Sequence, residues 1–254
     1  MLKIVSAEFI KGATARKQFP QTGIPEFAFF GRSNAGKSSL INMLLNRRNL
    51  VKTGSKPGMT REINFFMVNG HARTHSSSTE RVLTRDASDR SESCKCLKAG
   101  IPVDNGMFQG LSTAQQSTGD SVLRKAGQRA FCVADLPGYG FAQVSFSERN
   151  RIDKMLYDYT TTRRELKTVF FLMDIRRDPT DVELQTRAFF QGHGIELVLT
   201  ATKADKLSKT EQIKRITALA SFFDCPTDTI FLTSSSKKIG REKLLQHISA
   251  YLNT

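Results

Sequence analysis

The sequence predicts a three-layer α/β domain, in which helices cover both faces of a mostly parallel β-sheet. Two patterns lead to this prediction: short strands that are apolar throughout, and amphipathic helical stretches that lie between them. Strands of a parallel sheet are buried on both faces, so they read as continuous apolar runs. Each parallel connection needs a crossover, and the crossover helices then cover the sheet. We expect six strands, one of them antiparallel to the others.

The expected strands are short apolar runs that recur along the chain, at residues 26–30, 63–68, 130–134, 168–174, 196–200 and 229–232. Capping boxes predict two helix starts, because Thr or Ser followed three residues later by Glu satisfies N–H groups of the first turn. These pairs are Thr180 with Glu183 and Ser208 with Glu211. Apolar residues at helical spacing follow in two stretches, namely Ile213, Ile216, Leu219 and Phe223, and then Leu244, Leu245, Ile248 and Leu252.

Composition and charge favour a compact protein with an anionic partner. The chain has 254 residues, 39% of them apolar, so residues 1–254 suffice for a single domain with a sizeable core. The formal net charge of +14 favours a nucleic acid as partner, with surplus solvated lysine as the alternative. The chain shows no long apolar run and no signal peptide, and its few, irregularly spaced cysteines suggest a reducing compartment. We therefore expect a cytoplasmic monomer with no membrane partner.

One segment, residues 71–129, departs from this organisation. It loses apolar periodicity and is rich in Ser, Thr, Gly, Gln and Arg, which predicts a disordered or loosely ordered insertion. It lies between the strands expected at 63–68 and 130–134, so it should extend from the tip of a hairpin. Cys94 and Cys96 lack the second paired spacing of a zinc site.

A phosphate-binding loop follows the first expected strand. The match to G-x-x-x-x-G-K-[ST] is formed by Gly31, Arg32, Ser33, Asn34, Ala35, Gly36, Lys37 and Ser38, and Ser39 continues it into a helical pattern. Backbone N–H groups of such a loop and the positive end of the helix converge on the β-phosphate. Lys37 would neutralise the β- and γ-phosphates, and the Ser38 hydroxyl would ligate Mg²⁺.

Two further elements belong to the phosphate end of the expected site. Asp135, Leu136, Pro137 and Gly138 end the strand at 130–134, where a carboxylate can hold Mg²⁺ through water and a glycine N–H can meet the γ-phosphate. Thr60 lies in the loop before the strand at 63–68, where its hydroxyl can become a second Mg²⁺ ligand when the γ-phosphate is present. The candidate catalytic residues are Lys37, Thr60, Asp135 and Gly138.

A base-reading loop, Thr202, Lys203, Ala204 and Asp205, follows the fifth expected strand. The Asp205 carboxylate can accept hydrogen bonds from guanine N1–H and the exocyclic amine, while the stem of Lys203 packs on the ring. Adenine lacks both donors and would leave this carboxylate unpaired. After the sixth strand, backbone N–H groups for the guanine O6 could come from Thr233, Ser234 and Ser235.

Taken together, these motifs resemble the TrmE-Era-EngA-EngB-septin-like class of GTPases, and within it the EngB-type family. The strings that carry the resemblance span nearly the whole chain outside the insertion: FFGRSNAGKSSLINML, KPGMTREINFF, VADLPGYGFAQVS, TTRRELKTVFFLMDIRRDPT, TATKAD and SSSKKIG. The resemblance implies a P-loop GTPase domain that binds Mg²⁺ and GTP or GDP. It also implies a first switch formed by Gly58, Met59, Thr60, Arg61 and Glu62. The expected partner is the large ribosomal subunit and its rRNA, with a role in its assembly and in normal cell division and septation.

The expected site lacks one residue that many GTPases use in catalysis. Many GTPases place a glutamine after D-x-x-G to orient water, but Tyr139 occupies this position, so intrinsic hydrolysis should be slow. The missing assistance could come from a ribosomal surface that orders the switches, or from K⁺ held near Asn34. For Asn34 the alternative is that it only tolerates the conformation of the loop. Two other functions stay open: an ATP-dependent P-loop enzyme, which Asp205 disfavours, and a non-hydrolysing scaffold that nucleotide stabilises.

Overall fold

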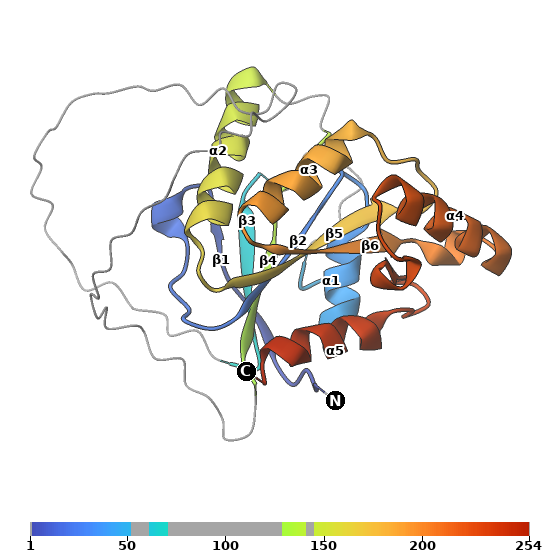
Figure 1. The fold of residues 1–254 in the computed structure, drawn as a ribbon. Coiled ribbons are helices and arrows are strands. Elements are labelled where there is room, and N and C mark those ends of the chain that lie inside the picture. Colours follow the sequence, from blue (N-terminus) through green and yellow to red (C-terminus); the bar gives the residue numbers. More distant parts are fainter. Residues whose placement is uncertain (1, 52–60, 71–128, 141–144, 254) are drawn as a thin grey trace, which may run out of the picture.

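The computed structural model of the chain describes residues 2–51, 61–70, 129–140 and 145–253. Within these ranges seven strands form one sheet, in the order β1-β3-β4-β2-β5-β6-β7 (Figure 1). The strands are β1 (Ala7–Ala13), β2 (Glu26–Gly31), β3 (Ile63–Val68), β4 (Phe131–Asp135), β5 (Leu166–Asp174), β6 (Glu196–Thr202) and β7 (Phe231–Leu232). Only β3 runs antiparallel, and it does so to both neighbours, β1 and β4. All six expected strands are present, but the expected number was one too low, because β1 was not foreseen.

Five α-helices cover the sheet in the described part of the chain. They are α1 (Lys37–Leu45), α2 (Phe146–Thr162), α3 (Asp181–Gly192), α4 (Lys209–Phe222) and α5 (Arg241–Tyr251), and short 3₁₀ turns lie at η1 (Arg16–Gln18), η2 (Ala204–Lys206) and η3 (Thr227–Thr229). Both predicted capping boxes are formed. The N–H of Thr180 donates to Glu183 at 2.7 Å, and the N–H of Ser208 donates to Glu211 at 2.8 Å.

Two apolar clusters fill the spaces on either side of the sheet, which confirms the three-layer architecture. Alternate residues of β2 point to opposite sides, so Ala28 and Phe30 join one cluster while Phe27 and Phe29 join the other. The first cluster includes side chains from α2, α3 and α4, and the second includes side chains from α1 and α5. The sheet is therefore the middle layer, and every parallel strand is buried on both faces.

Two apolar helical residues lie differently from the sequence pattern. Ile213, in the first half of α4, is 69% exposed, because the helix meets the core further on: Ile216 packs partly against it, and Leu219 and Ala220 are buried. Leu252 follows the end of α5 and packs only partly against the core, whereas Leu244 and Ile248 are fully buried. The face of each helix was thus predicted correctly, but not how far along the helix the core extends.

β3 and β4 pair as antiparallel neighbours, with Val68 opposite Phe131. Residues 71–129 therefore connect adjacent strands, as the sequence predicted. Most of this segment, residues 71–128, lies outside the described residues, and its expected disorder stays a prediction. The same holds for Cys94 and Cys96.

None of the described helices has the length and apolar character that a membrane crossing requires. The described residues also contain no cluster of three or more His, Cys, Asp or Glu side chains able to bind a metal.

Candidate nucleotide-binding site

The predicted site segments meet at one edge of the sheet. The P-loop follows β2, Asp135 ends β4, Thr202 ends β6, and Ser234 comes shortly after β7. Since β2, β4, β5, β6 and β7 are parallel, their carboxyl ends lie on the same edge. Ligands of open α/β sheets bind at this edge, where loops from several strands converge. The fold thus brings together segments that are far apart in the sequence.

The P-loop leaves the first turn of α1 open to an anion. The helix begins at Lys37, and its N-cap, Gly36, has a positive φ of 91° and no side chain to accept the free N–H groups. By contrast, the N-cap side chains of α2 and α4, Ser145 and Ser208, accept backbone N–H groups at their helix starts. No acidic residue lies in the first turn of α1. Free N–H groups at the positive end of a helix form an anion site, and the position is the one predicted for the β-phosphate.

Asp135 has the surroundings expected of a carboxylate that assists a cation. Its side chain is 1% exposed, and its Oδ1 atom has no hydrogen-bond partner among the described residues. Burial raises the pKa of Asp135 to about 6, against the opposing effect of the Lys37 charge. A buried oxygen without a partner is destabilising, and a hydrated Mg²⁺ would supply the missing donors. The residues present therefore fit Mg²⁺, with Ser38 as the ligand from the P-loop.

The segment from Asp135 to Tyr139 packs directly on the P-loop. The N–H of Leu136 donates to Phe29 at 3.1 Å, the N–H of Tyr139 donates to Gly31 at 3.3 Å, and the N–H of Ser33 donates back to Tyr139 at 2.9 Å. A β-carbon on Gly138 would lie 3.0 Å from the Gly31 oxygen and 3.2 Å from the Ser33 nitrogen. A side chain at position 138 would therefore push the backbone of the P-loop away, which accounts for the glycine of the D-x-x-G motif.

The base-reading loop is bonded to the P-loop as well. The Thr202 hydroxyl lies 2.7 Å from the Ala35 carbonyl oxygen and 3.0 Å from that of Met173. The Lys203 ammonium donates to the Asn34 carbonyl oxygen at 2.7 Å and to Asp174 at 3.0 Å. These contacts join the two ends of the predicted site, so the loops that carry Lys37 and Asp205 lie side by side.

Asp205 is held by the loop after β7. The Ser234 hydroxyl donates to the Asp205 carboxylate at 2.5 Å, and this hydrogen bond is the main reason that the pKa of Asp205 is lowered. The N–H of Thr233 donates to Ala201 and that of Ser234 to Ile239. Their N–H groups are therefore not available for the guanine O6, which corrects the prediction for these two residues. Ser235 keeps an N–H without a described partner, so of the three it is the one that fits the predicted role.

Not every predicted residue can be placed in the site. Gly58, Met59 and Thr60 lie outside the described residues. Arg61 is turned towards α2, where it forms an ion pair with Glu148 at 2.8 Å. The carboxylate of Glu62 lies against Gly12 of β1. In this structure neither Arg61 nor Glu62 has a described contact with the P-loop.

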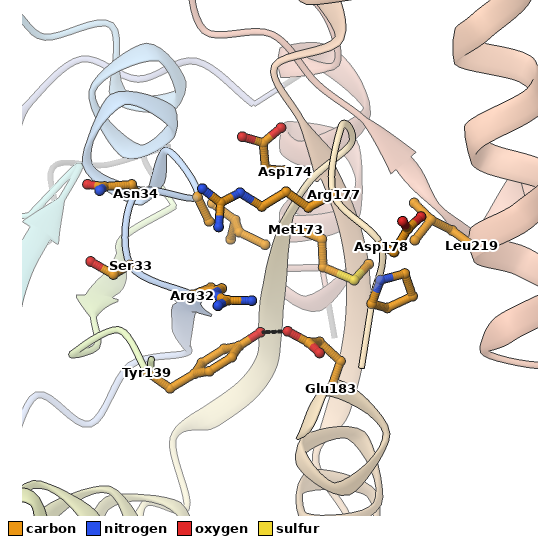
Figure 2. A pocket seen from close by; sticks show the side chains of 13 residues that line it. Arg32, Ser33, Asn34, Tyr139, Met173, Asp174, Arg177, Asp178, Glu183 and Leu219 are labelled. Atoms are coloured by element: carbon orange, nitrogen blue, oxygen red, sulfur yellow. Dashed lines mark hydrogen bonds between the residues drawn. The ribbon is translucent and has the colours of Figure 1, made fainter. Parts of the chain in front are cut away.

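A pocket beside the P-loop contains residues that motif analysis missed. It lies between the P-loop, Tyr139 and the segment that leads into α3 (Figure 2). There the Tyr139 hydroxyl donates to Glu183 at 2.5 Å, and Asp174 binds both Lys203 and Arg176. These hydrogen bonds hold the pKa of Asp174 well below its usual value, although burial opposes them. The position of Asp174 at the carboxyl end of β5 was the available signal, whereas the role of Glu183 as a helix cap concealed its contact with Tyr139.

The fold and this arrangement of loops define a P-loop GTPase. A family model described as "50S ribosome-binding GTPase" matches residues 26–203. The chain is 46% identical to a probable GTP-binding protein EngB of Treponema denticola, over 98% of this chain and 99% of the relative. It is 31% identical to the corresponding Bacillus subtilis protein, over 99% of this chain and 100% of the relative. The chain therefore belongs to the EngB group of the 50S ribosome-binding GTPase family. A crystal structure of a probable GTP-binding protein engB has the same fold, with a TM-score of 0.52, 19% identity, and coverage of 90% of this chain and 98% of that one.

Proposed function

We propose that this protein is a Mg²⁺-dependent switch that binds and hydrolyses GTP in the cytoplasm and assists assembly of the large ribosomal subunit. Normal cell division and septation would then depend on it through ribosome supply. The observation that carries the proposal is the direct bonding of the base-reading loop to the P-loop through Thr202 and Lys203. Membership of a family described as 50S ribosome-binding supports the partner, and the net charge of +14 suits an RNA surface.

We assign the site residues the following roles. Lys37 and the N-terminus of α1 would hold the phosphates, and Gly138 would offer its N–H to the γ-phosphate. Ser38, with Thr60 from the first switch, would ligate Mg²⁺, and Asp135 would accept hydrogen bonds from its water shell. Asp205 would read guanine through N1–H and the exocyclic amine.

GTP turnover with and without ribosomal particles tests enzyme and partner together. We expect slow phosphate release by the protein alone and a marked increase on addition of large-subunit particles, with small-subunit particles as the control. ATP in place of GTP should give no turnover above background. Turnover that stays at background with large subunits present would contradict the switch and favour a scaffold that nucleotide only stabilises.

The guanine assignment can be tested at Asp205. Asp205→Asn replaces one acceptor by a donor and should weaken GDP binding by roughly a hundredfold, because two hydrogen bonds to the base are lost or mismatched. Asp224→Asn is the matched control, since Asp224 is exposed and follows the far end of α4. Equal GDP affinity in both variants, or tighter binding of ADP than GDP by the unmodified protein, would refute the assignment.

We further propose that K⁺ assists hydrolysis through the side chain of Asn34. The backbone of Asn34 has a positive φ of 63°, so tolerance of this conformation is a competing reason for the residue. Asn34→Gly separates the two roles, because glycine keeps the backbone conformation and removes the side-chain oxygen. We expect faster turnover in K⁺ than in Na⁺ at equal ionic strength, and loss of this difference in Asn34→Gly. Equal rates in both salts for the unmodified protein would reject K⁺ assistance.

A further inference from the structure

Tyr139, the residue after the D-x-x-G motif, is fixed to two separate parts of the molecule. Its backbone is paired with the P-loop, through the N–H of Tyr139 to Gly31 and the N–H of Ser33 to Tyr139. Its ring packs against Phe30 and Phe171, with centroids 5.5 and 6.1 Å apart. Its hydroxyl reaches α3, where it donates to Glu183 (Figure 2). The segment that carries Gly138 is thus held at Tyr139 by the P-loop and by α3.

Glu183 uses both carboxylate oxygens in this arrangement. Oε1 accepts the Tyr139 hydroxyl at 2.5 Å, and Oε2 accepts the Thr180 N–H at 2.7 Å and the Thr180 hydroxyl at 2.6 Å. The side chain is only 4% exposed, so water cannot readily replace a lost donor. The same residue therefore caps α3 and fixes Tyr139. Because α3 is itself anchored in the core by Phe190, Glu183 is a rigid attachment point.

This contact also decides what Tyr139 can do. A hydroxyl has one proton to donate, and that of Tyr139 is directed at Glu183. Burial, and next the hydrogen bond to Glu183, raise the pKa of Tyr139, so the phenol stays protonated and remains a donor. Tyr139 is therefore not placed to orient an attacking water. Its effect on the site must pass through the neighbouring backbone.

We propose that Glu183 is a positioning residue for recognition of the γ-phosphate, and that it acts through the Tyr139 hydroxyl on the N–H of Gly138. This inference rests on the proposed function, in which Gly138 meets the γ-phosphate. An N–H group distinguishes GTP from GDP only if it is held where the γ-phosphate will be. Without the contact between Tyr139 and Glu183, Gly138 occupies this position for a smaller fraction of the time. The affinity for GTP then falls in proportion to the fraction of time that Gly138 spends in this position, while the affinity for GDP does not change.

The test compares affinities for GDP and for a non-hydrolysable GTP analogue, measured by calorimetry with Mg²⁺ present. Tyr139→Phe keeps the ring and removes only the hydroxyl. We expect it to lower affinity for the analogue roughly three- to tenfold, as for one lost hydrogen bond, and to change GDP affinity by less than about twofold. Tyr157→Phe is the matched control, because Tyr157 is 45% exposed on α2, and it should leave both affinities unchanged.

Two further variants separate positioning from general stability. Thr180→Val removes a hydrogen bond to the other oxygen of Glu183, so it should lower the thermal midpoint without changing the ratio of the two affinities. Glu183→Met, which removes both oxygens and so any hydrogen bond to Tyr139, should reproduce the effect of Tyr139→Phe on this ratio. The double variant at positions 139 and 183 should show no larger effect on this ratio than either single variant, because both changes remove the same contact.

Two results would overturn the inference while leaving the proposed function intact: an unchanged affinity ratio in Tyr139→Phe, whether or not both affinities fall, or additive effects in the double variant. Failure of the unmodified protein to bind either guanine nucleotide would instead refute the proposed function, and this inference with it. Thermal unfolding of each variant without nucleotide shows whether it is folded.

Discussion

Thr202 shows how one hydroxyl can join distant parts of a binding site. It lies at the end of β6, 4% exposed, and contacts carbonyl oxygens of both the P-loop and β5. Its hydroxyl holds the base-reading loop against the P-loop.

Thr202→Val should therefore weaken binding of GDP and GTP equally, by roughly tenfold, because it removes a hydrogen bond that holds the base-reading loop against the P-loop. We expect the free energy of unfolding to fall by about 1–2 kcal/mol, since the hydroxyl proton that two buried carbonyl oxygens share is lost. Calorimetric titration and urea unfolding measure the two effects. Thr200→Val is a suitable control, because Thr200 is also buried in β6 but bonds only Val198 in its own strand. A loss confined to GTP would show that this account of Thr202 is incorrect.

A buried ion pair between Glu26 and Arg163, at the other end of β2, stabilises the fold and is not part of the site. The Arg163 guanidinium binds Glu26 at 2.7 Å and the Pro20 carbonyl oxygen at 2.9 Å, and the Tyr159 hydroxyl donates to Glu26 at 2.5 Å. The side chains of Glu26 and Arg163 are 0% and 3% exposed. Beside them, burial and then the Glu26 charge raise the pKa of the free thiol of Cys132.

Arg163→Met should destabilise the protein by about 3–5 kcal/mol, because it leaves the Glu26 carboxylate buried without its counter-ion. Changing both partners, to Leu at position 26 and Met at position 163, should recover much of this loss, since no buried charge then remains. Urea unfolding of the two single variants and the double variant measures the coupling. A double variant that is less stable than Arg163→Met would contradict it. Nucleotide affinity should not change in any variant that stays folded.

At the scale of elements, β5, β6 and α5 are joined by a polar cluster far from the P-loop. Oε2 of Glu196 accepts from the Thr168 hydroxyl at 2.9 Å and the Tyr251 hydroxyl at 2.8 Å, and lies 2.9 Å from Nε2 of His247. The hydrogen bond from His247 lowers the pKa of Glu196 to about 2, although burial opposes it. The carboxylate form is thus more stable in the folded chain than in the unfolded one.

This shift predicts how stability depends on pH. A lowered pKa contributes stability that is fully present above the usual value for Glu, near 4.5, and is lost as the pH falls towards 2. The side chain is 43% exposed, so screening reduces the effect to about 1 kcal/mol. We expect the difference in unfolding free energy between the unmodified protein and Glu196→Gln to shrink between pH 6 and pH 3.5, measured in urea. Glu242→Gln, on the exposed start of α5, should show no such trend, and a constant difference for Glu196→Gln would refute the assignment.

The elements that sequence reasoning found are those whose pattern is local. Strands buried on both faces appear as apolar runs, and the starts of α3 and α4 follow from a pair of residues three positions apart. β1 has neither signal: it lies at the sheet edge, only Ala7 and Ala13 are buried, and an irregularity between Phe9 and Lys11 breaks its alternation. It is a strand because β3 offers an open edge, and this is a property of the fold.

The same distinction applies to the site. The P-loop, D-x-x-G and base-reading loop are short motifs, so they could be recognised, and the order of strands and helices correctly placed them at one edge. Asp174 and Glu183 belong to no nucleotide-binding motif, because Lys203 and Tyr139, which they contact beside the P-loop, are 29 and 44 residues away in the sequence. Only the packing of β5 and α3 beside the P-loop brings them to Lys203 and Tyr139.

At the scale of the whole molecule, most of the positive charge lies outside the insertion. Residues 71–129 hold nine Lys and Arg and six Asp and Glu, whereas the whole chain holds 38 and 24. A protein that binds RNA through its folded surface should keep this property when the insertion is removed. The pairing of Val68 with Phe131 shows that the ends of the segment are close together, so a short turn can join them.

Replacement of residues 71–128 by a two-residue Asn-Gly turn should therefore keep the fold, the GDP affinity and the binding of large-subunit particles. Asn69, which binds Lys3 and Val5 through its side chain, is retained and closes the end of β3. Affinity for the particles should still fall steeply as salt rises, because the remaining net charge is strongly positive. Sedimentation with particles at several salt concentrations tests this. Particle binding that is lost while GDP affinity stays unchanged would assign the ribosomal contact to the insertion and contradict the assignment to the folded surface.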